Sequence, residues 1–99
     1  MALTNNQIKH LRGLAHPIKP VVMIGQHGLT ETVMKEIHIA LDFHELIKVR
    51  ISGGDRDERK QIIEKIRNAT EAELVQSIGN IAVLFLRNQK KPKVVVPSS

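Results

Sequence analysis

Apolar and polar residues follow two different periods along the chain, and these periods predict alternating helices and strands. Apolar residues three or four positions apart, typical of a helix that buries one face, mark three segments: residues 4–16, 31–43 and 55–69. Apolar runs and strict alternation, typical of strands, mark four shorter segments: residues 21–24, 45–51, 73–78 and 81–86. This order predicts an α/β fold, a two-layer α-β-α-β-α-β-β sandwich.

Each predicted helix begins at a residue that can cap it. Thr4 with Gln7 forms a capping box, in which side chain and backbone of each residue bond to the other. Thr30 is a good cap for the second helix. Asp55 and Glu58 form a second box before the third. Three independent start signals therefore support the helix assignments.

The strand segments differ in how their faces are exposed. Residues 45–51 alternate, so Lys48 and Arg50 lie on one face and are candidates either for a solvated surface or for ligand contact. Residues 81–86 are apolar on both faces, which predicts a strand inside the sheet. Gly79 and Asn80 form a two-residue loop that predicts a hairpin with the preceding strand.

A G-x-x-G loop stands between the first strand and the second helix. Gly25 and Gly28 bracket Gln26 and His27, and glycine lets a backbone turn sharply or a ligand approach closely. The adjacent helix start offers free N–H groups, which suit a phosphate. Glu31 in the first helical turn would repel that phosphate. The motif is neither a Walker loop nor a dinucleotide fingerprint, and by itself it is more often a plain tight turn.

The length of 99 residues predicts one domain, residues 1–99, with a modest core.

The two ends of the chain are basic. Lys and Arg exceed Asp and Glu by 15 to 10, giving +5, but all ten acids lie within residues 31–73. Residues 1–30 and 74–99 carry seven bases and no acid, a distribution that attracts polyanions such as RNA. The simpler alternative is a basic surface kept for solubility. Residues 88–99 form a basic tail, in which residues 94–96 either add a short edge strand or pack on the globule.

Several function classes find no support in the sequence. There is no cysteine, no H-E-x-x-H pair and no nucleophile elbow, so we expect no enzyme, no cofactor and no metal site. No apolar run could span a bilayer and no signal peptide is recognisable, so we expect a cytoplasmic protein with no membrane partner and no small-molecule substrate. The two Phe, with no Tyr or Trp, make no aromatic platform for bases. RNA contact through phosphate, sugar and shape is the better expectation.

Three segments carry a resemblance to a known family. They are residues 11–16 (LRGLAH), 20–31 (PVVMIGQHGLTE) and 45–49 (ELIKV). In order and spacing they resemble the YhbY family, the stand-alone bacterial form of the CRM (chloroplast RNA splicing and ribosome maturation) domain. The resemblance implies a mixed four-stranded sheet, with the last strand antiparallel to the others, like the C-terminal domain of translation initiation factor three with an added N-terminal helix. It also implies association with precursors of the large ribosomal subunit.

The last strand departs from the family pattern. Relatives tend to have Leu-Tyr-Arg there, whereas this chain has Leu84, Phe85, Leu86 and Arg87. Contacts of that tyrosine hydroxyl or that arginine are therefore not carried over. The family's loop glycines correspond to Gly25 and Gly28.

We therefore expect a non-catalytic RNA-binding domain that contacts ribosomal RNA in large-subunit assembly. The loop would contact the RNA backbone. Cations on the first helix and the connector would extend the surface if that helix lies beside the loop, and the cations of the second strand are further candidates. The candidate RNA-binding residues are Gly25, Gln26, His27, Gly28, Lys9, Arg12, His16, Lys19, Lys48 and Arg50. The alternative is a protein-interaction module whose basic ends bind an acidic protein.

Overall fold

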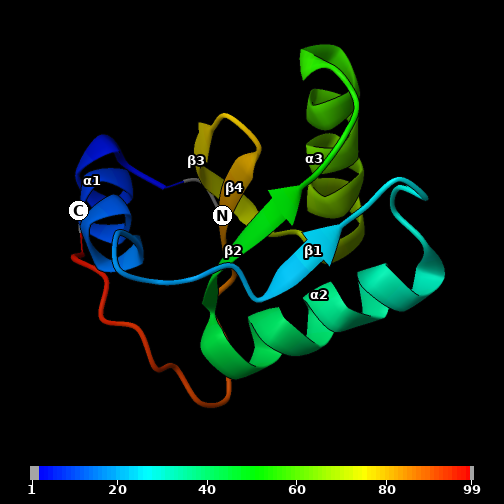
Figure 1. The fold of residues 1–99 in the computed structure, drawn as a ribbon. Helices are drawn as coiled ribbons and strands as arrows, with labels where there is room; N and C mark the ends of the chain where they lie inside the picture. The colour runs from blue at the N-terminus through cyan, green and yellow to red at the C-terminus, as the bar shows by residue number, and fades with distance from the viewer. Residues whose placement is uncertain (1–2, 99) are drawn as a thin grey trace.

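The computed structural model describes residues 3–98. The helices are α1 (Asn5–Ala15), α2 (Glu31–His44) and α3 (Arg56–Thr70). The strands are β1 (Val22–Ile24), β2 (Leu46–Ile51), β3 (Glu73–Ile78) and β4 (Ile81–Phe85). The α/β fold and its element order are those predicted from the sequence (Figure 1). None of these helices combines the length and the apolar character needed to cross a membrane.

The predicted N-terminal caps form at all three helix starts, and at α1 both halves of the capping box are present. In α1 the Thr4 hydroxyl accepts from Gln7 N at 3.1 Å and the Gln7 side chain accepts from Thr4 N at 2.9 Å. Thr30 accepts from Val33 N at 3.2 Å at the start of α2. Asp55 accepts from the third residue of α3 at 2.9 Å. Local side-chain chemistry therefore fixes where each helix begins.

The four strands form one mixed sheet in the order β1-β2-β4-β3. β1 runs parallel to β2, and β4 is antiparallel to both of its neighbours, β2 and β3. The expectations that the last strand lies inside the sheet and opposes the others are confirmed. β4 can occupy this place because its residues are apolar on both faces, so neither face needs water.

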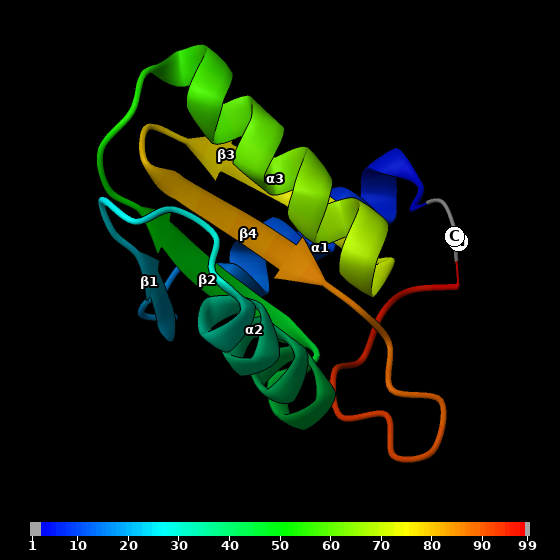
Figure 2. The same cartoon turned by 90° about the vertical axis from the view of Figure 1, so that its right-hand side faces the viewer.

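Both faces of the sheet are covered, by different elements. Figure 2 shows α2 and α3 in front of the sheet and α1 behind it. The α2–α3 face buries Ile24, Val49 and Leu84 with the apolar sides of these two helices. The opposite face, called the α1 face here, buries Leu46 and Phe85 beneath α1 and the C-terminal tail. The N-terminal helix is thus a cover for the second face of the sheet.

The tail after β4 packs on the α1 face without forming a strand between residues 86 and 98. Val94 and Val96 contact the core of this face. Gln7 Nε2 donates to Pro97 O at 2.8 Å, and the His10 ring lies 2.8 Å from Val95 O, which ties the tail to α1. The sequence left two alternatives for residues 94–96, a short edge strand or packing on the globule, and in the structure they pack on the globule.

The residues of the last strand that depart from the family pattern also serve the core. Phe85 is buried on the α1 face, so a tyrosine hydroxyl there would need a partner inside the protein. The Arg87 guanidinium lies 5.8 Å from the Phe85 ring centroid, within the range of a cation–π contact. The side chain of Arg87 therefore packs against the core of its own domain.

Glu45 differs from its predicted role as the first residue of a strand. β2 begins at Leu46, and Glu45 is the C-terminal cap of α2, with φ 64° and a fully buried side chain. Its carboxylate accepts from the backbone N–H groups of Asn88, Lys93 and Val94 at 2.5–2.6 Å. A positive φ at a non-glycine residue is costly, and these bonds to the tail offset that cost.

The environment of this carboxylate sets its protonation. Burial by itself raises the pKa of the Glu45 carboxyl, but the three backbone donors and the Arg87 guanidinium lower it, and the net pKa lies below the ordinary value. Because the pKa of Glu45 is lower in the folded state, its ionised carboxylate stabilises the fold fully when the pH is above the unfolded-state pKa. This stabilisation is lost as the pH falls through the folded-state pKa.

We predict that Glu45→Gln lowers the free energy of unfolding at pH 7 by about 2–4 kcal/mol, because a neutral amide replaces a charged acceptor of three bonds. The variant should also lose the acid-dependent part of stability that Glu45 supplies. Urea unfolding at neutral and acidic pH measures both effects. The matched control is Glu36→Gln, the same change at an exposed position of α2, which should stay within about ±0.5 kcal/mol. Equal losses in the two variants would contradict the anchoring role of Glu45.

Candidate nucleic-acid interface

The G-x-x-G loop is a tight turn that leaves its central residues exposed. Gly28 N donates to Gly25 O at 3.0 Å, which closes the turn, and Gln26 and His27 are exposed at its tip. Gly28 has φ +72°, whereas Gly25 is not among the residues with positive φ. The conformational freedom of glycine is thus required at the second position. At Gly25 a Cβ would meet no atom of residues 3–98 within 4 Å, so the space in front of this backbone is open.

The predicted basic face of α1 is present and exposed. Lys9, Arg12 and His16 are exposed, at spacings that place them on one side of the helix. His16 caps the C-terminal end of α1, and the Lys48 ammonium donates to its backbone oxygen at 3.2 Å. Lys48 therefore also has a structural role, since a cation at this end favours the helix dipole.

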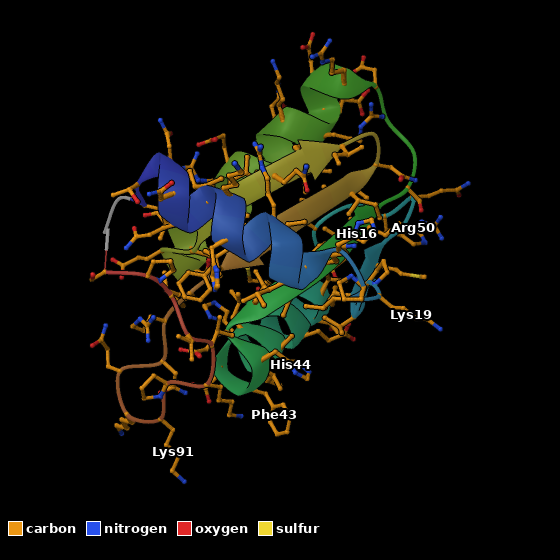
Figure 3. All side chains as sticks on the ribbon, turned by 90° about the vertical axis from the view of Figure 1, so that its left-hand side faces the viewer. His16, Lys19, Phe43, His44, Arg50 and Lys91 are labelled. Carbon is orange, nitrogen blue, oxygen red and sulfur yellow. The ribbon has the colours of Figure 1, made fainter. Side chains whose placement is uncertain are left out.

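A hollow on the α1 face brings the cations of α1 and β2 together. Arg12, His16 and Lys48 line it on one side, and Ile78 and Ile81 line it from the β3–β4 hairpin. None of its lining residues is acidic. Arg50 is exposed two residues beyond Lys48 on the same face of β2. Figure 3 looks onto this face and shows His16, Arg50 and Lys19 at the same end of it.

The loop and the α1 face are separate surfaces that meet at one edge of the sheet. Figures 1 and 2 agree that α1 and the loop after β1 lie on different sides of the molecule, so α1 does not lie beside the loop. Met23 pairs with Arg50 in register, and Gly25 follows Met23 by two residues. At about 3.3 Å per residue, Gly25 therefore lies only a short distance along the chain from Met23, the residue that pairs with Arg50. Lys9 lies farthest away, about 10 Å from His16 along α1.

Sequence reasoning did not find the apolar and amide side chains that complete this surface. Met23, Gln76, Ile78 and Ile81 join it because strand register places them opposite β2 residues or beside α1. The signal available was the assignment of residues 21–24, 73–78 and 81–86 to strands. It could not select them, because the register of strands distant in sequence is not encoded locally.

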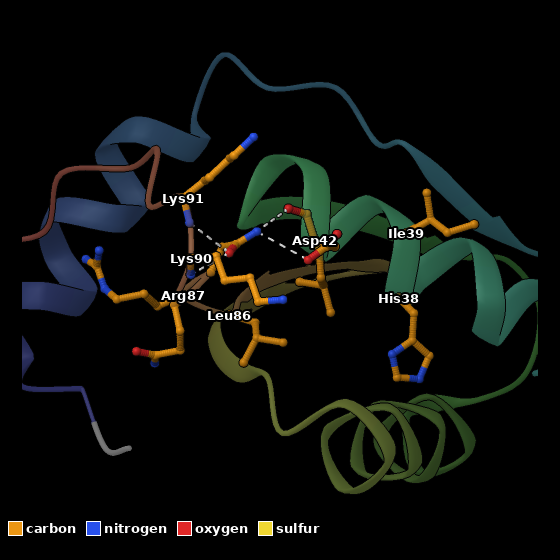
Figure 4. A pocket seen from close by; sticks show the side chains of 10 residues that line it. His38, Ile39, Asp42, Leu86, Arg87, Lys90 and Lys91 are labelled. Carbon is orange, nitrogen blue, oxygen red and sulfur yellow. Dashed lines mark hydrogen bonds between the residues drawn. The ribbon is translucent and has the colours of Figure 1, made fainter.

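A larger hollow lies elsewhere, between α2 and the start of the tail (Figure 4). Asn88 Nδ2 donates to the backbone and side-chain oxygens of Asp42 at 3.0 and 3.2 Å. Asn88 Oδ1 accepts from Lys90 N and Lys91 N at 3.0 and 3.1 Å. These polar groups hold the first turn of the tail against α2. Across residues 3–98 no group of three or more His, Cys, Asp or Glu side chains could hold a metal ion.

These features define a class of protein: a small α/β domain with a mixed sheet, an exposed glycine loop and an open basic face suited to an anionic ligand. Comparison with known proteins identifies its family. A model of the CRS1 / YhbY (CRM) domain matches residues 3–85, and the chain belongs to this family. The resemblance drawn from the three sequence segments is confirmed.

Individual relatives extend over almost the whole chain. The protein is 47% identical over 95 residues to an RNA-binding protein of Haemophilus influenzae, covering 96% of this chain and 95% of that one. It is 40% identical over 93 residues to a probable RNA-binding protein of Pseudomonas aeruginosa, covering 94% and 89%. Its fold is similar to the solution structure of a hypothetical Staphylococcus aureus protein described as a candidate RNA binder. That similarity has a TM-score of 0.82 at 36% identity and covers 97% of this chain and 100% of that one.

We predict that the two loop glycines respond differently to alanine. Gly28→Ala forces a side chain into positive φ and should lower the free energy of unfolding by about 1–2 kcal/mol. Gly25→Ala meets open space and needs no unusual backbone, so it should change stability by no more than about ±0.5 kcal/mol. Urea unfolding of the two variants measures the difference. Equal losses would show that both positions depend on glycine for the fold.

Proposed function

We propose that this protein is a non-catalytic RNA-binding domain that contacts ribosomal RNA during assembly of the large ribosomal subunit. The observation that carries the proposal is the convergence of Arg12, His16 and Lys48 around a hollow with no acidic lining residue, with Arg50 exposed on the same face of β2. Relatives across nearly the full length are named RNA-binding proteins. Cations on an open face suit the phosphate backbone, which supplies most of the affinity and little sequence information.

The proposed contacts divide between the loop and the α1 face. Loop backbone amides, with the exposed Gln26 and His27 side chains, would bind phosphate or ribose where Gly25 leaves room for close approach. Arg12 and Arg50 would bind phosphates of the same strand along the sheet. Lys9 and Lys19, which are also exposed, would add longer-range attraction that salt screens.

The alternative is that the basic surface binds an acidic protein. The experiment that separates the two treats a cell extract with ribonuclease and follows the protein through a sucrose gradient. If the protein binds precursors of the large subunit through RNA, it sediments with those particles and leaves them after the treatment. Sedimentation that is unchanged after complete digestion of RNA would favour the protein partner. Crosslinking in cells and sequencing of the attached RNA would then identify the site.

A charge change in the loop tests contact at its tip. We predict that Gln26→Asp with His27→Asp leaves the domain folded and weakens RNA binding by about 30-fold or more. A like-charge contact at 4 Å costs about 1 kcal/mol in water and about 4 kcal/mol at an effective dielectric constant near 20, and each 1.4 kcal/mol is about tenfold in affinity. Fluorescence anisotropy with a labelled ribosomal RNA fragment measures the change.

The control separates local contact from the change in net charge. Gln61→Asp with Asn68→Asp alters net charge similarly at two exposed positions of α3. Its effect should be small, because screening weakens exposed charges beyond about 8–10 Å. If loop variant and control lose equal affinity, the loop is a structural turn and not a contact site.

A further inference from the structure

A row of four side chains, three exposed and one half-buried, crosses the whole sheet at the uncovered end of the α1 face. Met23 pairs with Arg50, Arg50 with Ile81, and Ile81 with Ile78, so one side chain comes from each strand. Met23 is 60% exposed and Ile78 is 61% exposed. With about 4.8 Å between strands, the row is about 14 Å long. We refer to these four residues as the open row.

The open row is exposed because the cover on this face is short. Leu46 and Phe85, two pairs farther along the sheet, are buried beneath α1 and the tail. Between them and the open row, Lys48 and Val83 lie under the end of α1. The next pair consists of Ile81, which is half-buried at the hollow beside α1, and Arg50, which is exposed. The face therefore passes from a sealed core to an apolar strip that water reaches.

Phosphate binding alone does not explain this composition. A surface that contacts only phosphates needs donors and cations, whereas three of the four residues in the open row are aliphatic or thioether side chains. The apolar part of a nucleotide is the face of its base. In a duplex those faces are stacked and paired inside the helix, and only unpaired bases can turn outward onto a protein.

We propose that the open row is a binding site for the bases of an unpaired RNA strand. Met23, Ile78 and Ile81 contact base faces, the Arg50 guanidinium stacks on a base or bonds to its phosphate, and Arg12 and Lys48 hold adjacent phosphates. This inference rests on the proposed RNA-binding function and adds the class of RNA. It also revises the expectation that bases have no platform here, because aliphatic side chains can cover a base without an aromatic ring.

Charge favours an RNA strand over a second copy of the chain. A symmetric dimer through this face would bring the Arg50 and Lys48 side chains of two copies together, and like charges in contact are unfavourable. An apolar patch on α2, which includes Ile39 and Phe43, is also exposed, but Glu36 lies beside it. That patch therefore offers a control surface for the open row.

The test compares RNA strands that differ only in their bases. One strand is a short unpaired RNA, and the other has the same length and the same phosphates but abasic sugars at its central positions. Fluorescence anisotropy at constant salt should give the wild-type protein a clear preference for the intact strand. The preference is expected because the apolar faces of the bases leave water when they contact aliphatic and thioether side chains.

The variant Met23→Ser with Ile78→Ser removes two of the three apolar contacts and no charge. We expect about a tenfold loss of affinity for the intact strand, because apolar area that binding would bury is lost, and little change for the abasic strand. The control is Ile39→Ser with Val95→Ser, which are 69% and 80% exposed outside the open row, and it should bind both strands like the wild type. Urea unfolding confirms that each variant is folded.

The possible results distinguish failure of the base-binding inference from failure of the proposed RNA-binding function. If wild-type protein binds intact and abasic strands equally, or if Met23→Ser with Ile78→Ser weakens both strands alike, the open row does not bind bases while the RNA-binding function stands. If variant and control lose equal affinity for the intact strand, the inference also fails. If the wild-type protein binds neither strand, nor a ribosomal RNA fragment, the proposed function itself is overturned.

Discussion

The architecture depends on the apolar character of both faces of the central strand β4, which Leu46 extends to the start of its neighbour β2. A strand that is buried on one face needs one covering layer, but Leu46, Phe85, Val49 and Leu84 are buried on opposite faces of the same sheet. Each face therefore requires its own cover. α2 and α3 seal one face, and a single helix with an irregular tail covers the other. Because the second cover is shorter than the sheet, one end of that face stays open to solvent.

Glu45 holds the irregular part of this cover in place. A tail without regular structure has backbone N–H groups that need partners when it packs on a core. The Glu45 carboxylate accepts from three of them and reaches the tail from the junction of α2 and β2. The interaction anchors the tail at the end of the sheet opposite the cations. Tail anchoring and the open basic face can therefore be altered independently.

The sequence predicted what local chemistry determines. Thr4, Thr30 and Asp55 marked the helix starts correctly, and the two-sided apolar character of residues 81–86 placed β4 inside the sheet. It did not predict the role of Glu45, because its partners lie more than forty residues away in the chain. For the α1 face the sequence predicted only the individual cations. It did not predict the open row, because that row results from the register of the strands and from the length of α1. The ten proposed contact residues remain predictions.

Substitutions of the cations on the α1 face differ in how directly they measure binding. Lys48 closes the last turn of α1 by donating to His16 O, so its replacement removes a helix-capping interaction together with a charge. Arg50 extends from the exposed end of β2, beyond the cover, and Arg12 is exposed on α1. Substitutions at these two positions change the charge of the face at little cost to the core. An effect on affinity at Arg12 or Arg50 can therefore be assigned to the ligand, whereas an effect at Lys48 requires a parallel measurement of stability.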